Sequence, residues 1–147
     1  MKRITLLTGI LLLMVTGSFA QSLSPDKILG VWFSADNAMK IEIFKSGNTY
    51  SGKLLEAKFM FEADGKTPKK DTENPKEKLR SRSRQGLVHI TELTYKDGKY
   101  INGVLYSVEN GGTYSIKGEL KGPNDLETRG YKGVPMMGKT FKWTRVH

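Results

Sequence analysis

The sequence predicts an all-β protein, a single small antiparallel barrel of about eight strands. Period-two alternation rich in β-branched and aromatic residues recurs along most of the chain, and short turns containing Gly, Asn or Asp separate these runs. Helical periodicity is nowhere sustained. The length of 147 residues suits one domain, which we expect over residues 21–147. A chain of this size buries roughly two-thirds of its unfolded surface, enough for a core without disulfides.

Residues 1–20 have the three parts of a secretory signal. Lys2 and Arg3 are positive, residues 6–15 are mostly apolar, and small residues precede a cleavage site between Ala20 and Gln21. The apolar stretch is shorter than the ~20 residues of a spanning helix, so a retained anchor is the less favoured alternative. We expect a periplasmic or secreted protein with no transmembrane segment after cleavage.

The composition narrows the class of partner. The chain has a formal net charge of +9 and no cysteine. Small secreted animal domains usually rely on disulfides, so their absence favours a bacterial envelope. Outside the cytoplasm a basic surface meets anionic envelope components, such as glycans, lipid headgroups and acidic proteins, and we expect no nucleic-acid partner. The sequence does not indicate an oligomeric state.

A short helical turn is expected at residues 25–29, where Ser24 supplies an N-cap and Pro25 the first helical position. Strands and turns follow it in alternation. The turns with hairpin chemistry are 46–48, 96–99, 109–112 and 122–125. The predicted strands are residues 31–34, 39–44, 49–57, 87–95, 100–108, 113–120, 126–131 and 139–146.

Residues 58–86 interrupt this pattern, and we call them the excursion. A loop of that length is uncommon in a compact domain and is usually functional. Asn74 as N-cap and Pro75 at the first helical position predict a short helix from Pro75 to about Arg82, ended by Gly86. We interpret the excursion as a cover across one end of the barrel. Its Lys, Glu and Pro content leaves a disordered linker as the alternative.

Catalytic and metal-binding patterns are scarce. His89 and His147 are the only histidines, and His89 alternates with Val88 and Ile90, so we expect it to face solvent. No cluster offers the four or so ligands of a structural metal site, and no serine or threonine has a nearby histidine and acid. The sequence therefore predicts no enzyme, no metal and no cofactor, with a hydrolase as the least favoured class.

Arg80, Arg82 and Arg84 alternate with serines and form the most concentrated cationic feature. On an extended segment all three point to one side, and guanidinium groups match carboxylate and phosphate geometry. Two interpretations follow. The arginines bind an anionic ligand, or they bond to loop carbonyls and pin the excursion down, as runs of surface charge more often do.

The first interpretation places a ligand where the excursion meets the strand that carries Arg129 and Gly130. The candidate binding residues are Arg80, Arg82, Arg129, Tyr131, Tyr106 and Asn74. On this basis we expect a non-catalytic binding module for a small or extended ligand with an acidic group, lipid-like ligands included. The alternative is a structural or interaction protein of the envelope with no small-molecule ligand.

Several motifs occur in order across residues 30–145. They are Gly30-x-Trp32, Asp71-x-x-Asn74-Pro75, Leu79-Arg80-x-Arg82, Gly86, Leu105-Tyr106, Asn110-Gly111, Thr113-Tyr114, Leu126-x-x-Arg129-Gly130-Tyr131-x-Gly133 and Gly138-x-Thr140-x-x-Trp143-x-Arg145. Together they resemble an uncharacterised secreted bacterial family, catalogued as domain of unknown function 2147. This chain departs from the family pattern at Ser107-Val108, where an Asp-Pro is usual, and at Tyr100, where a Trp is usual.

The pattern is also similar to the lipocalin and fatty-acid-binding barrels. In those proteins a Gly-x-Trp on the first strand packs over the barrel floor, and a basic residue on the last strand bonds across it. The resemblance assigns these parts to Gly30, Trp32 and Arg145. Independently of it, we expect Trp32 and Trp143 in the core and not on a ligand surface, because large aromatic side chains dominate burial in small domains.

Overall fold

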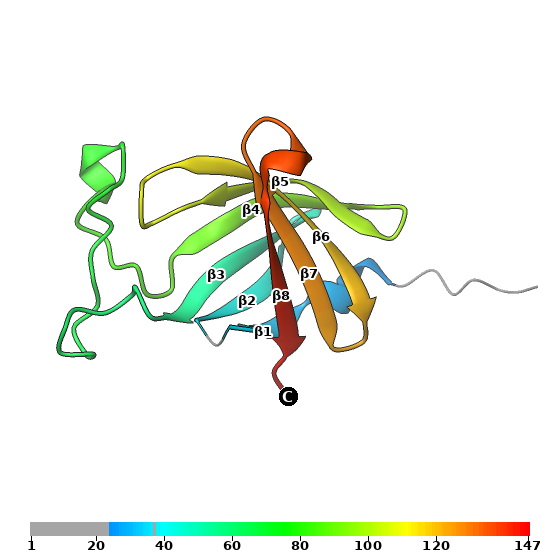
Figure 1. Ribbon diagram of the computed structural model, residues 1–147, viewed down its shortest axis with the longest axis horizontal. Coiled ribbons are helices and arrows are strands. Elements are labelled where there is room, and N and C mark those ends of the chain that lie inside the picture. Colours follow the sequence, from blue (N-terminus) through cyan, green and yellow to red (C-terminus); the bar gives the residue numbers. More distant parts are fainter. Residues whose placement is uncertain (1–23, 37) are drawn as a thin grey trace, which may run out of the picture.

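The computed structural model describes residues 24–36 and 38–147, and its eight strands form one closed antiparallel barrel (Figure 1). Each strand pairs with the next along the chain, and β1 pairs with β8 to close the sheet. The strands are β1 (Gly30–Ser34), β2 (Met39–Ser46), β3 (Thr49–Ala57), β4 (Val88–Lys96), β5 (Lys99–Tyr106), β6 (Thr113–Gly122), β7 (Asp125–Tyr131) and β8 (Lys139–Arg145). The predicted all-β barrel is confirmed. The predicted signal cleavage site lies outside the described residues.

Helical structure in the described residues is limited to three 3-10 turns: η1 (Pro25–Ile28), η2 (Glu77–Leu79) and η3 (Pro135–Met137). The first lies within the helical turn predicted at residues 25–29. The short helix predicted from Pro75 to about Arg82 was too long, because only η2 forms there. The Asn74 side chain accepts a hydrogen bond from the backbone N–H of Lys76 and donates to Asp71, so Asn74 stabilises a turn and does not begin an α-helix.

The two ends of the barrel differ. At the closed end, tight turns join β2 to β3, β4 to β5 and β6 to β7, and η1 lies across the opening. Two of these turns use glycines in the left-handed region, Gly47 (φ 61°) and Gly98 (φ 81°), a conformation that side chains disfavour. At the open end the connections are longer: residues 35–38, the excursion, residues 107–112 and residues 132–138.

The floor of the barrel is built around Trp32, which is fully buried. Its indole N–H donates to the Ile28 carbonyl at 2.9 Å, and the Arg145 guanidinium lies 4.2 Å from the ring centroid. Arg145 also donates to the Leu29 carbonyl at 2.7 Å. Gly30 has φ 125°, and a Cβ there would lie 2.9 Å from Arg145 Nη1. The glycine therefore leaves room for the arginine to cross from β8 to η1.

Bulges interrupt the alternation of β4 and decide which of its side chains face inward. Gly52 pairs with Ile90 and Lys53 with Val88, so one step along β3 matches two steps along β4. The additional residue is His89. A bulge lets consecutive side chains share a face, and His89 and Ile90 are both buried. The prediction that His89 faces solvent was wrong because it assumed unbroken alternation.

The excursion is folded, and it lies beside the 107–112 turn at the left of Figure 1. Backbone hydrogen bonds join its two halves, including Asp71 N–H to the Arg82 carbonyl and Arg84 N–H to the Lys69 carbonyl. It meets the barrel closely at Gly111, where a Cβ would lie 2.0 Å from the Glu73 carbonyl oxygen. The segment flanks the open end.

Candidate ligand cavity

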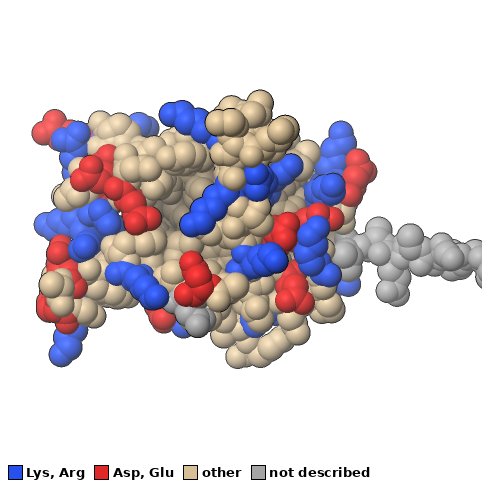
Figure 2. Space-filling model, in the orientation of Figure 1, with Lys and Arg blue, Asp and Glu red and all other residues tan. Residues whose placement is uncertain are grey.

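A cavity of about 560 Å³ opens inside the barrel at its open end. Its size is within the range of small-molecule pockets, and its walls are mainly apolar. Figure 2 shows the hollowed face of the molecule below the η3 segment. The apolar side chains that line the cavity are Met39, Leu54, Phe59, Ile90, Leu105, Val108, Ile116, Met137, Phe141 and Trp143. Of these, Phe59 comes from the excursion and Met137 from η3.

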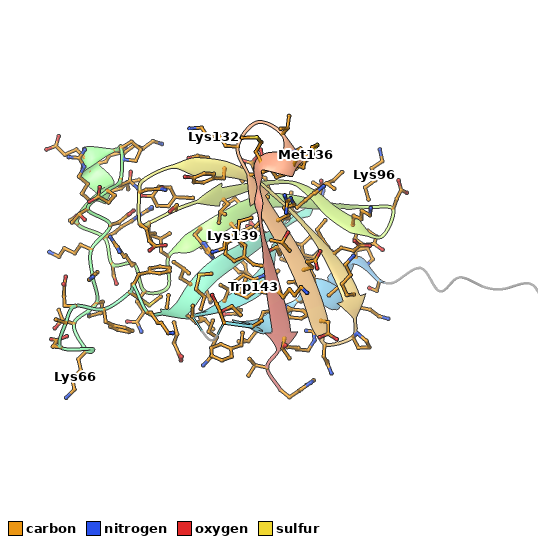
Figure 3. The ribbon with its side chains drawn as sticks, viewed as in Figure 1. Lys66, Lys96, Lys132, Met136, Lys139 and Trp143 are labelled. Carbon is orange, nitrogen blue, oxygen red and sulfur yellow. The ribbon has the colours of Figure 1, made fainter. Side chains whose placement is uncertain are left out.

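Two buried tryptophans have different places in this arrangement. Trp32 belongs to the floor, whereas Trp143 is 4% exposed and lines the cavity. The Trp143 indole N–H donates to the Thr128 hydroxyl at 2.9 Å, so its polar atom is already satisfied. Figure 3 shows Trp143 on β8 further from η3 than Lys139. Trp143 therefore offers a ligand an apolar surface.

His89 is the polar exception in the cavity wall. The residue is 7% exposed, and its Nε2 atom has no hydrogen-bond partner among the described residues. Burial lowers the pKa of His89 to about 4, because the charged imidazolium would lose its hydration. A neutral imidazole has one N–H donor and one acceptor nitrogen. A buried polar atom of this kind is expected to find a partner, and the described residues supply none.

The buried histidine leads to a prediction about pH. The folded protein keeps His89 neutral down to about pH 4, whereas the unfolded chain takes up the proton near pH 6.5. Between these values the unfolded state binds more protons, so the free energy of unfolding falls as the pH falls, by about 3 kcal/mol from this residue. Denaturation curves measured from pH 7 to pH 4 check this prediction. Over this range the free energy of unfolding of the wild type should fall by about 3 kcal/mol more than that of His89→Leu.

The matched control is His147→Leu, because His147 is exposed at the C-terminus. This variant should keep the pH dependence of the wild type. Parallel curves for wild type and His89→Leu would contradict a buried neutral His89.

The rim of the cavity is polar and mixed in charge. Its charged side chains are two lysines and two acids, and a tyrosine lies beside them: Lys132, Lys139, Asp36, Glu109 and Tyr131. The Lys139 ammonium lies 4.9 Å from the Phe141 ring centroid, directly above an apolar wall of the cavity. The carboxylate of Asp36 accepts a hydrogen bond from the Ser34 hydroxyl, which is the main cause of its lowered pKa. A cationic group is therefore available where the apolar cavity meets solvent.

Three of the six candidate residues converge on Asp71, a fully buried carboxylate. Asn74 Nδ2 donates to it at 2.8 Å, Arg82 Nη2 lies 2.8 Å away, and the Tyr106 hydroxyl donates at 2.7 Å. Burial and the Asp71 carboxylate together raise the pKa of Tyr106 to about 12, so its hydroxyl stays protonated as a donor. Arg80 Nε donates to the Asn74 carbonyl at 2.8 Å. The contacts of Asn74, Arg80 and Arg82 lie within the excursion and hold its fold, and the Tyr106 hydroxyl joins the excursion to β5. Arg80 thus bonds to a loop carbonyl, as the second interpretation of the arginines expects.

Arg129 lies in a different part of the molecule. Its Nε donates to the Pro135 carbonyl at 2.6 Å, and its Nη1 donates to the Thr140 hydroxyl at 2.6 Å. In Figure 1 the η3 segment that it holds stands at the top, well separated from the excursion. The expected grouping of Arg129 with Arg80 and Arg82 was therefore wrong. The reason is that the excursion meets the barrel at Tyr106 and the 107–112 turn, whereas η3 packs on β7.

Two of the candidate residues line the cavity. They are Tyr131, at the end of β7, and Tyr106, at the end of β5. His89, Lys132 and Lys139 also line the cavity, although the sequence did not single them out as candidates. The case of His89 has a structural reason. A register irregularity between β3 and β4 hides its orientation, and such a bulge carries no distinct sequence signal here.

The described residues contain no group of three or more His, Cys, Asp or Glu side chains placed to hold a metal ion. Within the same residues, no helix is long and apolar enough to span a bilayer.

The comparisons with known proteins agree with this architecture. The chain is similar to a solved structure described as "Protein HP1028 from the human pathogen Helicobacter pylori belongs to the lipocalin family". The two share 28% identity with a TM-score of 0.70, over 82% of this chain and 83% of that one. No significant match was found among the curated proteins. A family model described as "Uncharacterized protein conserved in bacteria (DUF2147)" matches residues 30–145. The chain therefore belongs to the DUF2147 family and has a lipocalin-like barrel.

Proposed function

We propose that this protein is a non-catalytic binding protein that holds a small, largely apolar ligand inside its barrel. The proposal rests on the open cavity of about 560 Å³, whose apolar wall contains a buried imidazole with no hydrogen-bond partner for its Nε2 atom among the described residues. Filled barrels of eight strands leave no such space, whereas ligand-binding barrels do. The similarity to a structure described as a lipocalin supports the same function.

The ligand on this proposal carries an acidic group at its outer end. Moving a carboxylate beside the neutral, buried His89 would remove its hydration without an opposite charge in return. At the rim, by contrast, Lys132 and Lys139 can pair with the acidic group while water still reaches it. The apolar body would then contact Trp143 and Phe141, and His89 would bond to a hydroxyl or carbonyl group of the ligand.

The site acts by binding and holds no catalytic arrangement. The Nε2 atom of His89 has no hydrogen-bond partner among the described residues, so no acid or serine hydroxyl engages this atom as a catalytic pair would. This chemistry suits a lipid-like acid or another anionic amphiphile. An envelope protein that acts only through its surface remains the alternative, and the cavity is the feature that separates the two.

A fluorescent anionic amphiphile, 1-anilinonaphthalene-8-sulfonate, tests this proposal directly. We expect saturable binding to the wild type. Leu105→Trp should weaken it at least tenfold, because Leu105 lines the cavity and the larger ring would fill it. Val104→Trp is the matched control, since the neighbouring residue on β5 lies outside the cavity lining and should leave binding unchanged.

The outcome that contradicts the proposal is equal binding by wild type, Leu105→Trp and Val104→Trp, which would locate the probe on the outer surface. A wild type that binds none of the probe would favour the surface-acting alternative. Thermal melts of all three proteins show whether the substitutions leave the barrel folded.

We also propose that the binding takes place outside the cytoplasm. The proposal is supported by the charged, apolar and small-residue parts of the leader. N-terminal sequencing of the exported protein should begin at Gln21, and a cytosolic protein that begins at Met1 would contradict export.

A further inference from the structure

The 132–138 connection between β7 and β8 exposes apolar side chains at the rim of the cavity. Val134 is 56% exposed, Met136 90% and Met137 80%. Figure 3 shows Met136 and Lys132 at the outer edge of the molecule, above Lys139. We call residues 132–138 the tip. Figure 2 has the same orientation as Figure 1. Where Figure 1 draws the tip, Figure 2 shows protruding uncharged atoms, with blue Lys or Arg side chains beside and below them.

The tip is held in this conformation by the barrel. Arg129 donates to the carbonyls of Pro135 (2.6 Å) and Met136 (3.1 Å), two successive residues of η3. Gly138 lies tightly on β7, because a Cβ there would be 2.5 Å from the Gly130 carbonyl oxygen. The apolar side chains are thus presented outward on a fixed support, and little conformational freedom remains to be lost when the tip meets a partner.

The charges around the tip have one sign along the chain. Residues 128–142 include four lysines and arginines and no aspartate or glutamate: Arg129, Lys132, Lys139 and Lys142. The nearest acids on the rim, Asp36 and Glu109, come from other connections of the open end. The chain is also basic: without Lys2 and Arg3, its formal net charge falls from +9 to +7. An anionic partner is therefore complementary to this edge of the barrel.

We propose that the tip docks the open end of the barrel on an anionic lipid surface. Exposed apolar side chains can enter the boundary between headgroups and acyl chains, and nearby lysines are attracted to anionic headgroups. A stable protein interface usually buries about 800 Å² on each partner, which is much more than three side chains on a convex tip provide. A bilayer requires no complementary pocket and accepts such a tip.

This inference extends the proposed function but does not depend on it. Docking would bring the mouth of the cavity to the headgroup region, since Lys132, Met137 and Gly138 of the tip also line the cavity. Lys139, which lines the cavity too, follows the tip directly. An amphiphile could then pass between the bilayer and the barrel with its acidic group near the two lysines.

Flotation with lipid vesicles tests the proposal, using the mature protein and vesicles of phosphatidylethanolamine with phosphatidylglycerol. We expect the wild type to float with these vesicles and not with vesicles of phosphatidylcholine alone. The double variant Val134→Ser/Met136→Ser should lower the partition coefficient at least tenfold, because neither residue lines the cavity and both are exposed. Lys132→Gln should lower it about fivefold.

Lys96→Gln is the matched control, because Lys96 is equally a surface lysine but stands at the closed end of the barrel (Figure 3). It should leave the partition coefficient within about twofold of the wild type. Equal losses in the Lys96 and Lys132 variants would reduce the effect to overall charge and overturn the docking site. Absence of wild-type binding, or binding that ignores the double substitution, would overturn it as well.

The two proposals can fail separately. Leu105→Trp, which fills the cavity, should still float with anionic vesicles. Val134→Ser/Met136→Ser should still bind 1-anilinonaphthalene-8-sulfonate in the absence of lipid.

Discussion

Trp32→Ala is expected to lower the free energy of unfolding by about 3–5 kcal/mol, the usual range for truncating a buried tryptophan. The substitution removes a fully buried ring, its hydrogen bond to the Ile28 carbonyl and the surface on which Arg145 lies. Because the same ring joins η1, β1 and β8, no single segment can move to fill the space. Urea denaturation followed by circular dichroism measures the change.

Phe33→Ala is the control for this prediction. Phe33 is the next residue on β1, faces outward and is partly exposed, with the Lys40 ammonium 5.8 Å from its ring centroid. We expect a loss below about 1 kcal/mol, in the range of surface contacts. If both substitutions destabilise the protein equally, Trp32 is not the centre of the floor.

Asp71→Asn is expected to lower the free energy of unfolding by about 3 kcal/mol while ligand binding persists. The buried carboxylate accepts bonds from Asn74, Arg82 and Tyr106, and an amide of the same shape cannot accept all of them. Breaking a buried ion pair destabilises by 3–5 kcal/mol, and partial exposure of the Arg82 side chain (37%) places this case at the lower limit. Thermal or urea melts in parallel with probe titrations give both quantities.

Asp64→Asn serves as the matched substitution within the excursion. Asp64 accepts bonds from Lys66 and Thr67, but it is exposed, so we expect a loss below about 1 kcal/mol. If Asp71→Asn left the free energy of unfolding unchanged but altered the affinity for the anionic probe, the result would support an anion-binding role for Arg80 and Arg82. In that case the released Arg82 would be part of a binding site.

The barrel could be predicted from the sequence because its signals are local. Alternation along β2 and β6 and the glycines of the closed-end turns each specify a strand or a hairpin within a few residues. The motifs on the first and last strands, which contain Gly30, Trp32 and Arg145, resemble those of known barrels and so predicted that the sheet closes. Each of these signals depends on a single residue or on its near neighbours.

The site was less predictable because it depends on register and on long-range packing. His89 faces the cavity owing to one additional residue in β4, a difference that neither hydrophobicity nor spacing reveals. Arg129 donates to carbonyls of η3, although its position beside Gly130 and Tyr131 resembles a ligand site. The apolar residues of the tip appear in the sequence as an ordinary connection, and only the folded structure shows them at the mouth of the cavity.

If the barrel interior holds a ligand, native mass spectrometry of the protein isolated from its own host should detect that ligand. We expect a wild-type population heavier than the bare chain by the mass of one small molecule. Leu105→Trp, isolated in the same way, should have only the mass of its own chain. A wild type without added mass, or an identical adduct on the folded Leu105→Trp variant, would contradict binding in the cavity.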